Sequence, residues 1–212
     1  AADWDNVGHL VGDSEAEVKK VLVALDITEE VVETAIGKGY DVIVSHHPLV
    51  FRPVNALNGE TGVQRKLIKL IKNDIAAMSF HTRLDAVDGG VNDILAAKLG
   101  LENMQIIDPV DGIGLLRCGE AKEQPLVDFL AAVKKKLGCD GLRYVNSNRS
   151  VRKVAVGGGS CADEMMAALR AGCDTFVTSD VKYNQFWDAY DVGLNLIDAG
   201  HFYTENPIVA VL

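Results

Sequence analysis

Four of the five histidines in this sequence lie at the carboxyl ends of apolar stretches that are typical of buried strands: His46, His47, His81 and His201. An imidazole nitrogen binds transition metals and exchanges protons near neutral pH. If the strands are parallel, their carboxyl ends lie at the sheet edge where ligands bind in open α/β folds. The four rings are therefore candidates for a metal site, and hydrogen-bonded loop histidines are the alternative.

Two of these histidines are followed by a carboxylate four residues later, His81 by Asp85 and His201 by Glu205. This spacing places both side chains on one face, so each pair is either a set of metal ligands or a structural hydrogen bond. No cysteine stands close to them in the sequence, which favours zinc, manganese, iron, cobalt or nickel held by nitrogen and oxygen. Two carboxylates and up to four imidazoles exceed the needs of one tetrahedral ion. A dinuclear centre with a bridging carboxylate fits the set better.

His46 and His47 are neighbours and precede Pro48. In a regular strand adjacent side chains point to opposite faces, so a single ion would not easily take both rings. Two ions close together could take one ring each. Pro48 also restricts His47 to an extended conformation, which limits where its imidazole can reach.

Alternating strand and helix patterns position these residues. Strands are predicted at 21–25, 41–45, 75–80, 113–117, 142–145, 154–156 and 194–198, and helices at 29–38, 64–72, 125–137 and 162–170. Thr28 is a suitable N-cap for the first helix because two glutamates follow it. Continuous apolar strands that alternate with helices predict an α/β fold of mostly parallel or mixed sheets flanked by helices.

An internal repeat indicates duplication. Residues 18–23 align with 151–156, and the same offset pairs Asp41 with Asp174. A second block pairs the His81 motif with the His201 motif. Any two βαβ units share valines and glycines, but they do not ordinarily share a histidine followed by a carboxylate. We predict two related α/β halves, 1–110 with His46, His47, His81 and Asp85, and 111–212 with His201 and Glu205.

Composition excludes several classes of protein. The chain has 212 residues, 48% of them hydrophobic, which is enough for a real core and excludes disorder. A net charge of −9 argues against direct binding to nucleic acid. No apolar run is long enough for a membrane span, and no signal peptide opens the sequence. The four cysteines lack CxxC spacing and are expected to be buried thiols. A cytoplasmic protein is expected.

Weaker candidates lie elsewhere. A glycine turn at 157–160 precedes a predicted helix and offers weak support for an anionic ligand, because the Walker lysine and the GxGxxG spacing are missing. A tight turn explains it equally well. Asp180 stands where the repeat places His47, so Asp180 and Lys182 are candidates for lining the same cleft. His9 lies far from the strand ends and is expected to be a surface or packing residue.

The sequence resembles the NIF-three-like family, whose bacterial members are named GTP cyclohydrolase I type 2 homologues. The resemblance is carried by Trp4-Asp5-Asn6-Val7-Gly8, Ser45-His46-His47-Pro48-Leu49-Val50-Phe51, His81-Thr82-Arg83-Leu84-Asp85, Gly89-Gly90-Val91-Asn92-Asp93, Thr178-Ser179-Asp180 and Gly200-His201-Phe202-Tyr203-Thr204-Glu205. These stretches run in family order over nearly the whole chain. The combination of His-His-Pro with His-x-x-Thr-Glu is specific to the family.

The resemblance implies a homohexamer, a trimer of dimers, with two divalent metal ions per subunit facing an internal cavity. The implied ligands are His46, His47, Asp85, His201 and Glu205, with Glu205 bridging both ions. His81 would be a weaker ligand or lie beside the centre. Family members usually carry a helix before the Trp-Asp-Asn motif and more chain after Glu205, so both ends are expected to be incomplete. An apolar residue is usual at the position of His9.

Two classes of function follow. The first is a metal-dependent hydrolase acting on a nucleotide or related small molecule, in which bound cations lower the pKa of a shared water and His81 or Asp180 transfers protons. The family name implies attack on the guanine ring of GTP. The alternative is a non-catalytic metal-handling or scaffold protein that uses the same ligands. A Rossmann-like nucleotide binder ranks last, because its fingerprint is absent.

Overall fold

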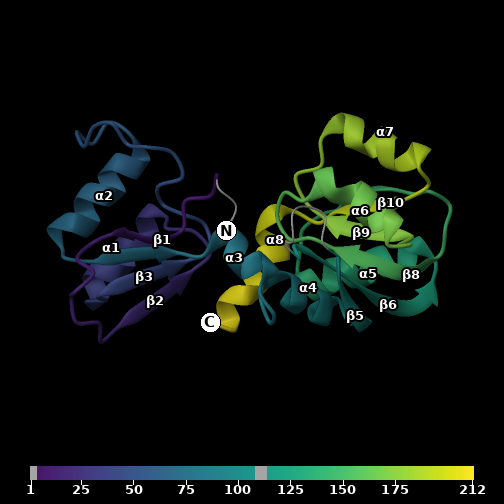
Figure 1. Ribbon diagram of the computed structural model, residues 1–212, viewed down its shortest axis with the longest axis horizontal. Coiled ribbons are helices and arrows are strands. Elements are labelled where there is room, and N and C mark those ends of the chain that lie inside the picture. The colour runs from purple at the N-terminus through teal and green to yellow at the C-terminus, as the bar shows by residue number, and fades with distance from the viewer. Residues whose placement is uncertain (1–3, 108–113) are drawn as a thin grey trace. The chain divides into compact units, whose positions relative to one another are not determined.

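The computed structural model describes residues 4–107 and 114–212, which form two compact units (Figure 1). The first unit comprises the chain up to Leu84 together with Leu212, and the second runs from Asp85 to Val211. Each contains a sheet flanked by helices, which confirms the predicted fold class. The predicted boundary between positions 110 and 111 lies outside the described residues. No helix in the described ranges is long and apolar enough to cross a membrane.

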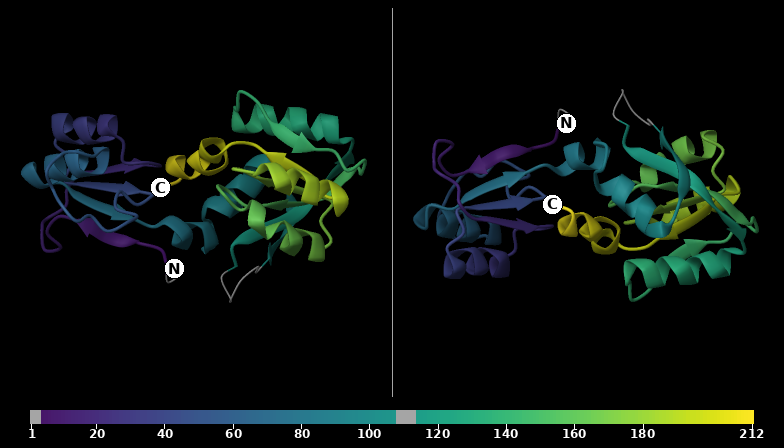
Figure 2. Two further views of the ribbon diagram at one scale, coloured as in Figure 1. Left: turned by 90° about the horizontal axis from the view of Figure 1, so that it is seen from above. Right: turned by 90° about the horizontal axis from the view of Figure 1, so that it is seen from below.

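The first unit is built on a four-stranded sheet in the order β1-β4-β3-β2. Its strands are β1 (Gly8–Val11), β2 (Val21–Ala24), β3 (Val42–Ser45) and β4 (Ala76–Ser79). Strands β2, β3 and β4 are parallel, and β1 pairs with β4 in the antiparallel sense. Because the parallel strands follow one another in one direction, both connecting helices cover the same face. Those helices are α1 (Glu29–Lys38) and α2 (Gly62–Lys72), seen from two further sides in Figure 2.

Local signals fix where these helices begin and end. The Thr28 hydroxyl accepts a hydrogen bond from the backbone N–H of Val31 at 3.1 Å, which confirms the predicted N-cap. Gly39 ends α1 in the left-handed conformation at φ 62°, where a side chain would be strained. Residues of α1 and α2 pack with those of the sheet in one apolar core, which includes Val32, Leu70 and Ile43.

The second unit contains a six-stranded mixed sheet in the order β5-β6-β8-β9-β10-β7. Its strands are β5 (Glu102–Ile107), β6 (Leu116–Gln124), β7 (Arg143–Val145), β8 (Val151–Val156), β9 (Thr175–Thr178) and β10 (Asn195–Asp198). The helices are α3 (His81–Ala86), which begins in the first unit, α4 (Val91–Leu99), α5 (Leu126–Leu137), α6 (Met165–Arg170), α7 (Tyr183–Asp191) and α8 (His201–Glu205), with short 3₁₀ turns η1 (Ala162–Glu164) and η2 (Asn206–Ala210).

Both faces of this second sheet are covered, which explains its continuous apolar strands. In β8, Val154 faces the core formed with α4 and α5, whereas Ala155 faces the core formed with α6. The strand predicted at 113–117 is the start of β6, which continues to Gln124. Position 113 itself lies outside the described residues.

The two units share a topology, as duplication predicts. The order β7-β10-β9-β8 in the second sheet repeats β1-β4-β3-β2 in the first, with the same three parallel strands and the same antiparallel edge. In each unit a helix that starts with histidine follows the last parallel strand: α3 after β4 and α8 after β10. Strands β5 and β6 extend only the second sheet.

Equivalent aspartates hold the start of the first parallel strand in both units. The Asp41 carboxylate accepts hydrogen bonds from the backbone N–H groups of Lys19 and Lys20, at 2.8 and 2.7 Å. These bonds hold the pKa of Asp41 below its usual value. The Asp174 carboxylate does the same for Arg152 and Lys153. Such matched detail, at positions paired by the sequence repeat, goes beyond what two unrelated βαβ units share.

Replacing Asp174 should therefore destabilise the second unit. Asp174 is buried and also accepts a hydrogen bond from the Thr175 hydroxyl at 2.8 Å. Asp174→Ala leaves the buried Thr175 hydroxyl and the partly buried N–H groups of Arg152 and Lys153 without this acceptor, so we expect a loss of about 3 kcal/mol in the free energy of unfolding. Urea denaturation followed by circular dichroism measures it. Asp191→Ala, at the exposed end of α7, is the control and should change stability by less than about 0.5 kcal/mol. Equal losses for the two variants would contradict the assigned role.

Candidate functional site

Three imidazoles of the first unit form one cluster. His46 and His47 follow β3 directly, and His81 follows β4, so the parallel strands deliver all three to one sheet edge. Ring centroids of His46 and His47 lie 4.7 Å apart, and both rings are within 6 Å of the His81 ring, at 5.5 and 5.7 Å. His46 is fully buried, whereas His47 and His81 are partly exposed.

Carboxylates orient two of these rings through the Nδ1 atom. His47 Nδ1 donates to Asp26 at 2.9 Å, and His81 Nδ1 donates to Asp5 at 2.6 Å. An ionised carboxylate only accepts hydrogen bonds, so the proton stands on Nδ1 and the metal-binding lone pair on Nε2. This is the arrangement in which histidine usually binds a metal ion.

Asp5 is held in its ionised form. Its carboxylate also accepts hydrogen bonds from the Thr82 hydroxyl at 2.5 Å and from the Thr82 backbone N–H at 3.3 Å. Burial acts to raise the pKa of Asp5, but the hydrogen bonds from Thr82 and His81 outweigh it and hold the pKa below its usual value. Asp5 therefore remains an acceptor for His81 at neutral pH.

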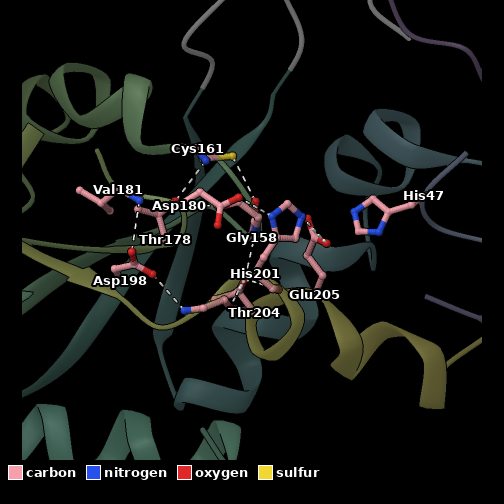
Figure 3. Close-up of polar contacts among 12 residues, drawn as sticks. His47, Gly158, Cys161, Thr178, Asp180, Val181, Asp198, His201, Thr204 and Glu205 are labelled. Atoms are coloured by element: carbon pink, nitrogen blue, oxygen red, sulfur yellow. Dashed lines mark hydrogen bonds and ion pairs between the residues drawn. The ribbon is translucent and has the colours of Figure 1, made fainter. Parts of the chain in front are cut away.

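In the second unit, His201 lies between two carboxylates (Figure 3). Its Nε2 atom lies 3.0 Å from Glu205, one turn along α8, and its Nδ1 atom donates to Asp180 at 2.7 Å. The hydrogen bond and charge of Glu205, with those of Asp180, outweigh the opposing effect of burial and raise the pKa of His201 to about 9. In the absence of a metal ion, a proton thus links the histidine to the buried glutamate.

Asp198, at the end of β10, positions both partners of this arrangement (Figure 3). One oxygen accepts the backbone N–H of Val181 at 3.2 Å, next to Asp180, and the other accepts the N–H of Gly200 at 3.1 Å, next to His201. A single buried carboxylate therefore fixes the two loops from which Asp180 and His201 project.

The glycine turn after β8 makes room for Glu205. A Cβ atom on Gly159 would stand 2.0 Å from a Glu205 carboxylate oxygen, and φ is 64° at that position. The backbone N–H of Gly158 donates to Asn92 at 2.6 Å, and that of Gly159 donates to Thr204 at 3.0 Å. Because these N–H groups already have acceptors within the unit, the turn does not offer them to an anion, and its weak support for an anionic ligand falls away.

Asp85 is a further buried carboxylate of the second unit. It is buried on α3, and its backbone carbonyl accepts a hydrogen bond from Asn92 at 3.2 Å. Burial, followed by the negative charges of Asp85 and Glu205, raises the pKa of the Cys161 thiol. Cys161 is consequently inert as a nucleophile, in keeping with the expectation of buried thiols.

Both residues predicted as proton-transfer candidates occupy the left-handed region of the backbone. His81 has φ 32° and Asp180 has φ 53°. Histidine and aspartate tolerate this region better than most residues, but it still costs about 1–3 kcal/mol at each position. Hydrogen bonds on each side chain, His81 to Asp5 and Asp180 to His201, hold the strained conformations in place.

The structure thus brings together His46, His47 and His81 in one unit, and Asp180, His201 and Glu205 in the other. Sequence reasoning missed the roles of Asp5 and Asp26 as partners of the histidines. Only weak indications of these roles are present in the sequence: Asp5 belongs to the Trp-Asp-Asn motif, and Asp26 closely follows β2. His9, in β1, is exposed.

Known proteins resemble the chain over nearly its full length. The model of the Duf34/NIF3 (NGG1p interacting factor 3) family matches residues 1–212. A GTP cyclohydrolase 1 type 2 homolog of Clostridium perfringens is 41% identical over 97% of this chain and 80% of its own length. The crystal structure of a Staphylococcus aureus hypothetical protein has a TM-score of 0.90 at 36% identity, covering 96% of this chain and 81% of that one. A Bacillus cereus protein related to NIF3 has a TM-score of 0.91 at 28% identity, with coverage of 96% and 84%.

The His201 imidazole should titrate near pH 9 in the metal-free protein. Since this pKa lies above the ordinary 6.5, protonation of the ring stabilises the fold fully below about pH 6.5, and that contribution is lost as the pH rises through about 9. Nuclear magnetic resonance of the imidazole protons measures the pKa. Glu205→Gln should lower it more than Asp180→Asn does, because Glu205 is the larger cause. A wild-type ring that titrates at its ordinary value, as in the urea-unfolded chain, would refute the arrangement.

Gly159→Ala should displace Glu205. The added methyl group would overlap its carboxylate, so we expect the His201 pKa to fall towards its ordinary value. Titration of the imidazole followed by nuclear magnetic resonance measures this change. Gly193→Ala is the matched control, because its φ of 71° imposes a similar backbone strain and a Cβ there meets nothing within 4 Å. If both variants behave alike, backbone strain rather than the clash is responsible.

Proposed function

The chain belongs to the Duf34/NIF3 family, and from this premise we propose that it is a dinuclear metal-binding protein that acts as a metal-dependent hydrolase on a nucleotide or related small molecule. The proposed ligands are those that the family resemblance implies: His46, His47, Asp85, His201 and Glu205. Zinc, manganese, iron, cobalt and nickel each suit this set of nitrogen and oxygen ligands. A homohexamer belongs to the same proposal, and light scattering of the purified protein tests it.

The observation that carries this proposal is the carboxylate on Nδ1 of a proposed ligand in each unit. Asp26 orients His47, and Asp180 orients His201. Such partners fix the ring and raise the basicity of the nitrogen that binds the metal. Gly159 also supports the proposed metal ligands, because its missing side chain leaves space for the Glu205 carboxylate.

The residues present suit hydrolysis. Divalent ions held by these ligands would polarise a substrate oxygen or ring carbon and make water more acidic. His81 is the proposed proton carrier, since Asp5 holds its Nδ1 proton and leaves Nε2 for exchange with a substrate or water. Asp180 is the second proposed carrier, and its hydrogen bond to His201 also supports a role in positioning that ring.

Metal content measured together with GTP turnover tests this function. We expect about two transition-metal ions per chain in gently purified protein, and GTP hydrolysis that depends on them. Glu205→Ala should lose metal and turnover together, because the shared carboxylate is removed. Glu123→Ala, at the exposed end of β6, is the control and should keep both.

The remaining outcomes separate the alternatives. Two ions without turnover of GTP or of other nucleotides would favour the metal-handling or scaffold function over hydrolysis. Less than one ion per chain, after zinc, manganese and iron have each been supplied, would reject the dinuclear centre.

A further inference from the structure

A pocket of about 640 Å³ lies within the first unit beside His47. Three segments line it: the connection from β2 to α1, the loop after β3, and α2. Its charged lining residues are Asp26, Arg52 and Lys66. The volume is in the range of pockets that bind small molecules. The pocket thus places a proposed metal ligand next to a space of substrate size.

The charges of this pocket favour an anion. Lys66 and Arg52 bring two cations, whereas the carboxylate of Asp26 is already engaged by His47 Nδ1. This local excess of positive charge stands out in a chain whose net charge is −9. An anion drawn to the pocket would therefore be held by specific side chains and not by the overall field of the protein.

Lys66 is well placed to bind such a group. Its ammonium donates one hydrogen bond to the Ile27 carbonyl at 2.7 Å, which fixes the side chain against the pocket wall. An ammonium has three donors, so two more are available to a ligand. Burial lowers the pKa of Lys66, against the raising effect of Glu29 and Asp26, and an added anion would relieve that cost. Arg52 is exposed and carries a planar guanidinium that suits phosphate oxygens.

The rest of the lining is apolar. Apolar side chains from all three segments contribute to the wall: Ile27, Leu49, Val50, Phe51, Val54 and Val63. Phe51 is 48% exposed, and its ring contacts those of Trp4 and His81 only edge to face, so aromatic surface remains for a planar ligand ring. Apolar walls with two cations suit a ligand that has both a flat ring and an anionic group.

We propose that this pocket binds an organic phosphate monoester with a planar ring, its phosphate on Lys66 and Arg52 and its ring against Phe51 and the apolar wall. The inference rests on the proposed function only in making this ligand the substrate presented to His47. Binding itself requires no metal ion, so it can be measured independently.

Calorimetry on the metal-stripped whole chain tests the pocket, with guanosine 5′-monophosphate as the probe. Lys66→Gln and Arg52→Gln should each weaken binding by about tenfold or more, because each removes a charged donor. Lys72→Gln is the matched control: it removes the same charge from the exposed end of α2, outside the pocket lining, and should weaken binding by less than about twofold. Guanosine, which lacks the phosphate, should bind at least about tenfold more weakly than the nucleotide.

Each result decides for or against the pocket. Absence of nucleotide binding to the wild-type chain, or equal affinities for guanosine and its monophosphate, would overturn the proposal. So would unchanged binding in both Lys66→Gln and Arg52→Gln, of which the second alters an exposed side chain and should fold normally. If the variants weaken binding as expected while the metal measurements fail, the pocket stands and the hydrolase proposal falls.

Discussion

A carboxylate bonded to imidazole Nδ1 is the interaction on which the site residues of both units depend. It occurs three times, as Asp5 with His81, Asp26 with His47 and Asp180 with His201. Without such a partner an imidazole can turn about its χ2 angle and exchange the roles of its two nitrogens. Each carboxylate removes that freedom by holding Nδ1, so Nε2 points away from the acid, and in His201 it lies 3.0 Å from Glu205. The orientation of these histidine rings therefore depends on their acidic partners.

The two units share this arrangement, which agrees with the predicted duplication. In both units a histidine is the first residue of the helix after the last parallel strand, and a carboxylate follows one turn later. The helix therefore starts where parallel strands expose their carboxyl ends, the usual place for ligands in α/β sheets. The units also differ: the first has two further histidines after β3, whereas the second has Asp180 at the place that the repeat pairs with His47, where it accepts a hydrogen bond from His201.

Local features such as helix ends could be predicted from the sequence, whereas contacts between residues far apart in the sequence could not. Helix α1 was predicted with its observed ends, because Thr28 and Gly39 mark them. The outer half of β6 was missed, since its end at Glu120–Gln124 is polar and lacks an apolar strand pattern. Asp5 could not be assigned to His81 because 75 intervening residues separate them and only the folded β1–β4 pairing brings their segments together. The glycine turn was ambiguous for the same reason: its role depends on Glu205, which is distant in sequence.

Buried acids in the second unit connect the proposed metal site with the protonation of His201. Asp85 and Glu205 are both buried, and the negative charge of each raises the pKa of the Cys161 thiol. Burying carboxylates in one region is costly unless positive charge compensates them. In the metal-free protein the raised pKa of His201 shows how Glu205 is compensated, by an imidazolium 3.0 Å away. If the proposed ligands hold a metal ion, His201 would have to release that proton, and the ion would supply the positive charge in its place. Under that proposal metal and proton would compete for His201, so acidic conditions would weaken metal binding.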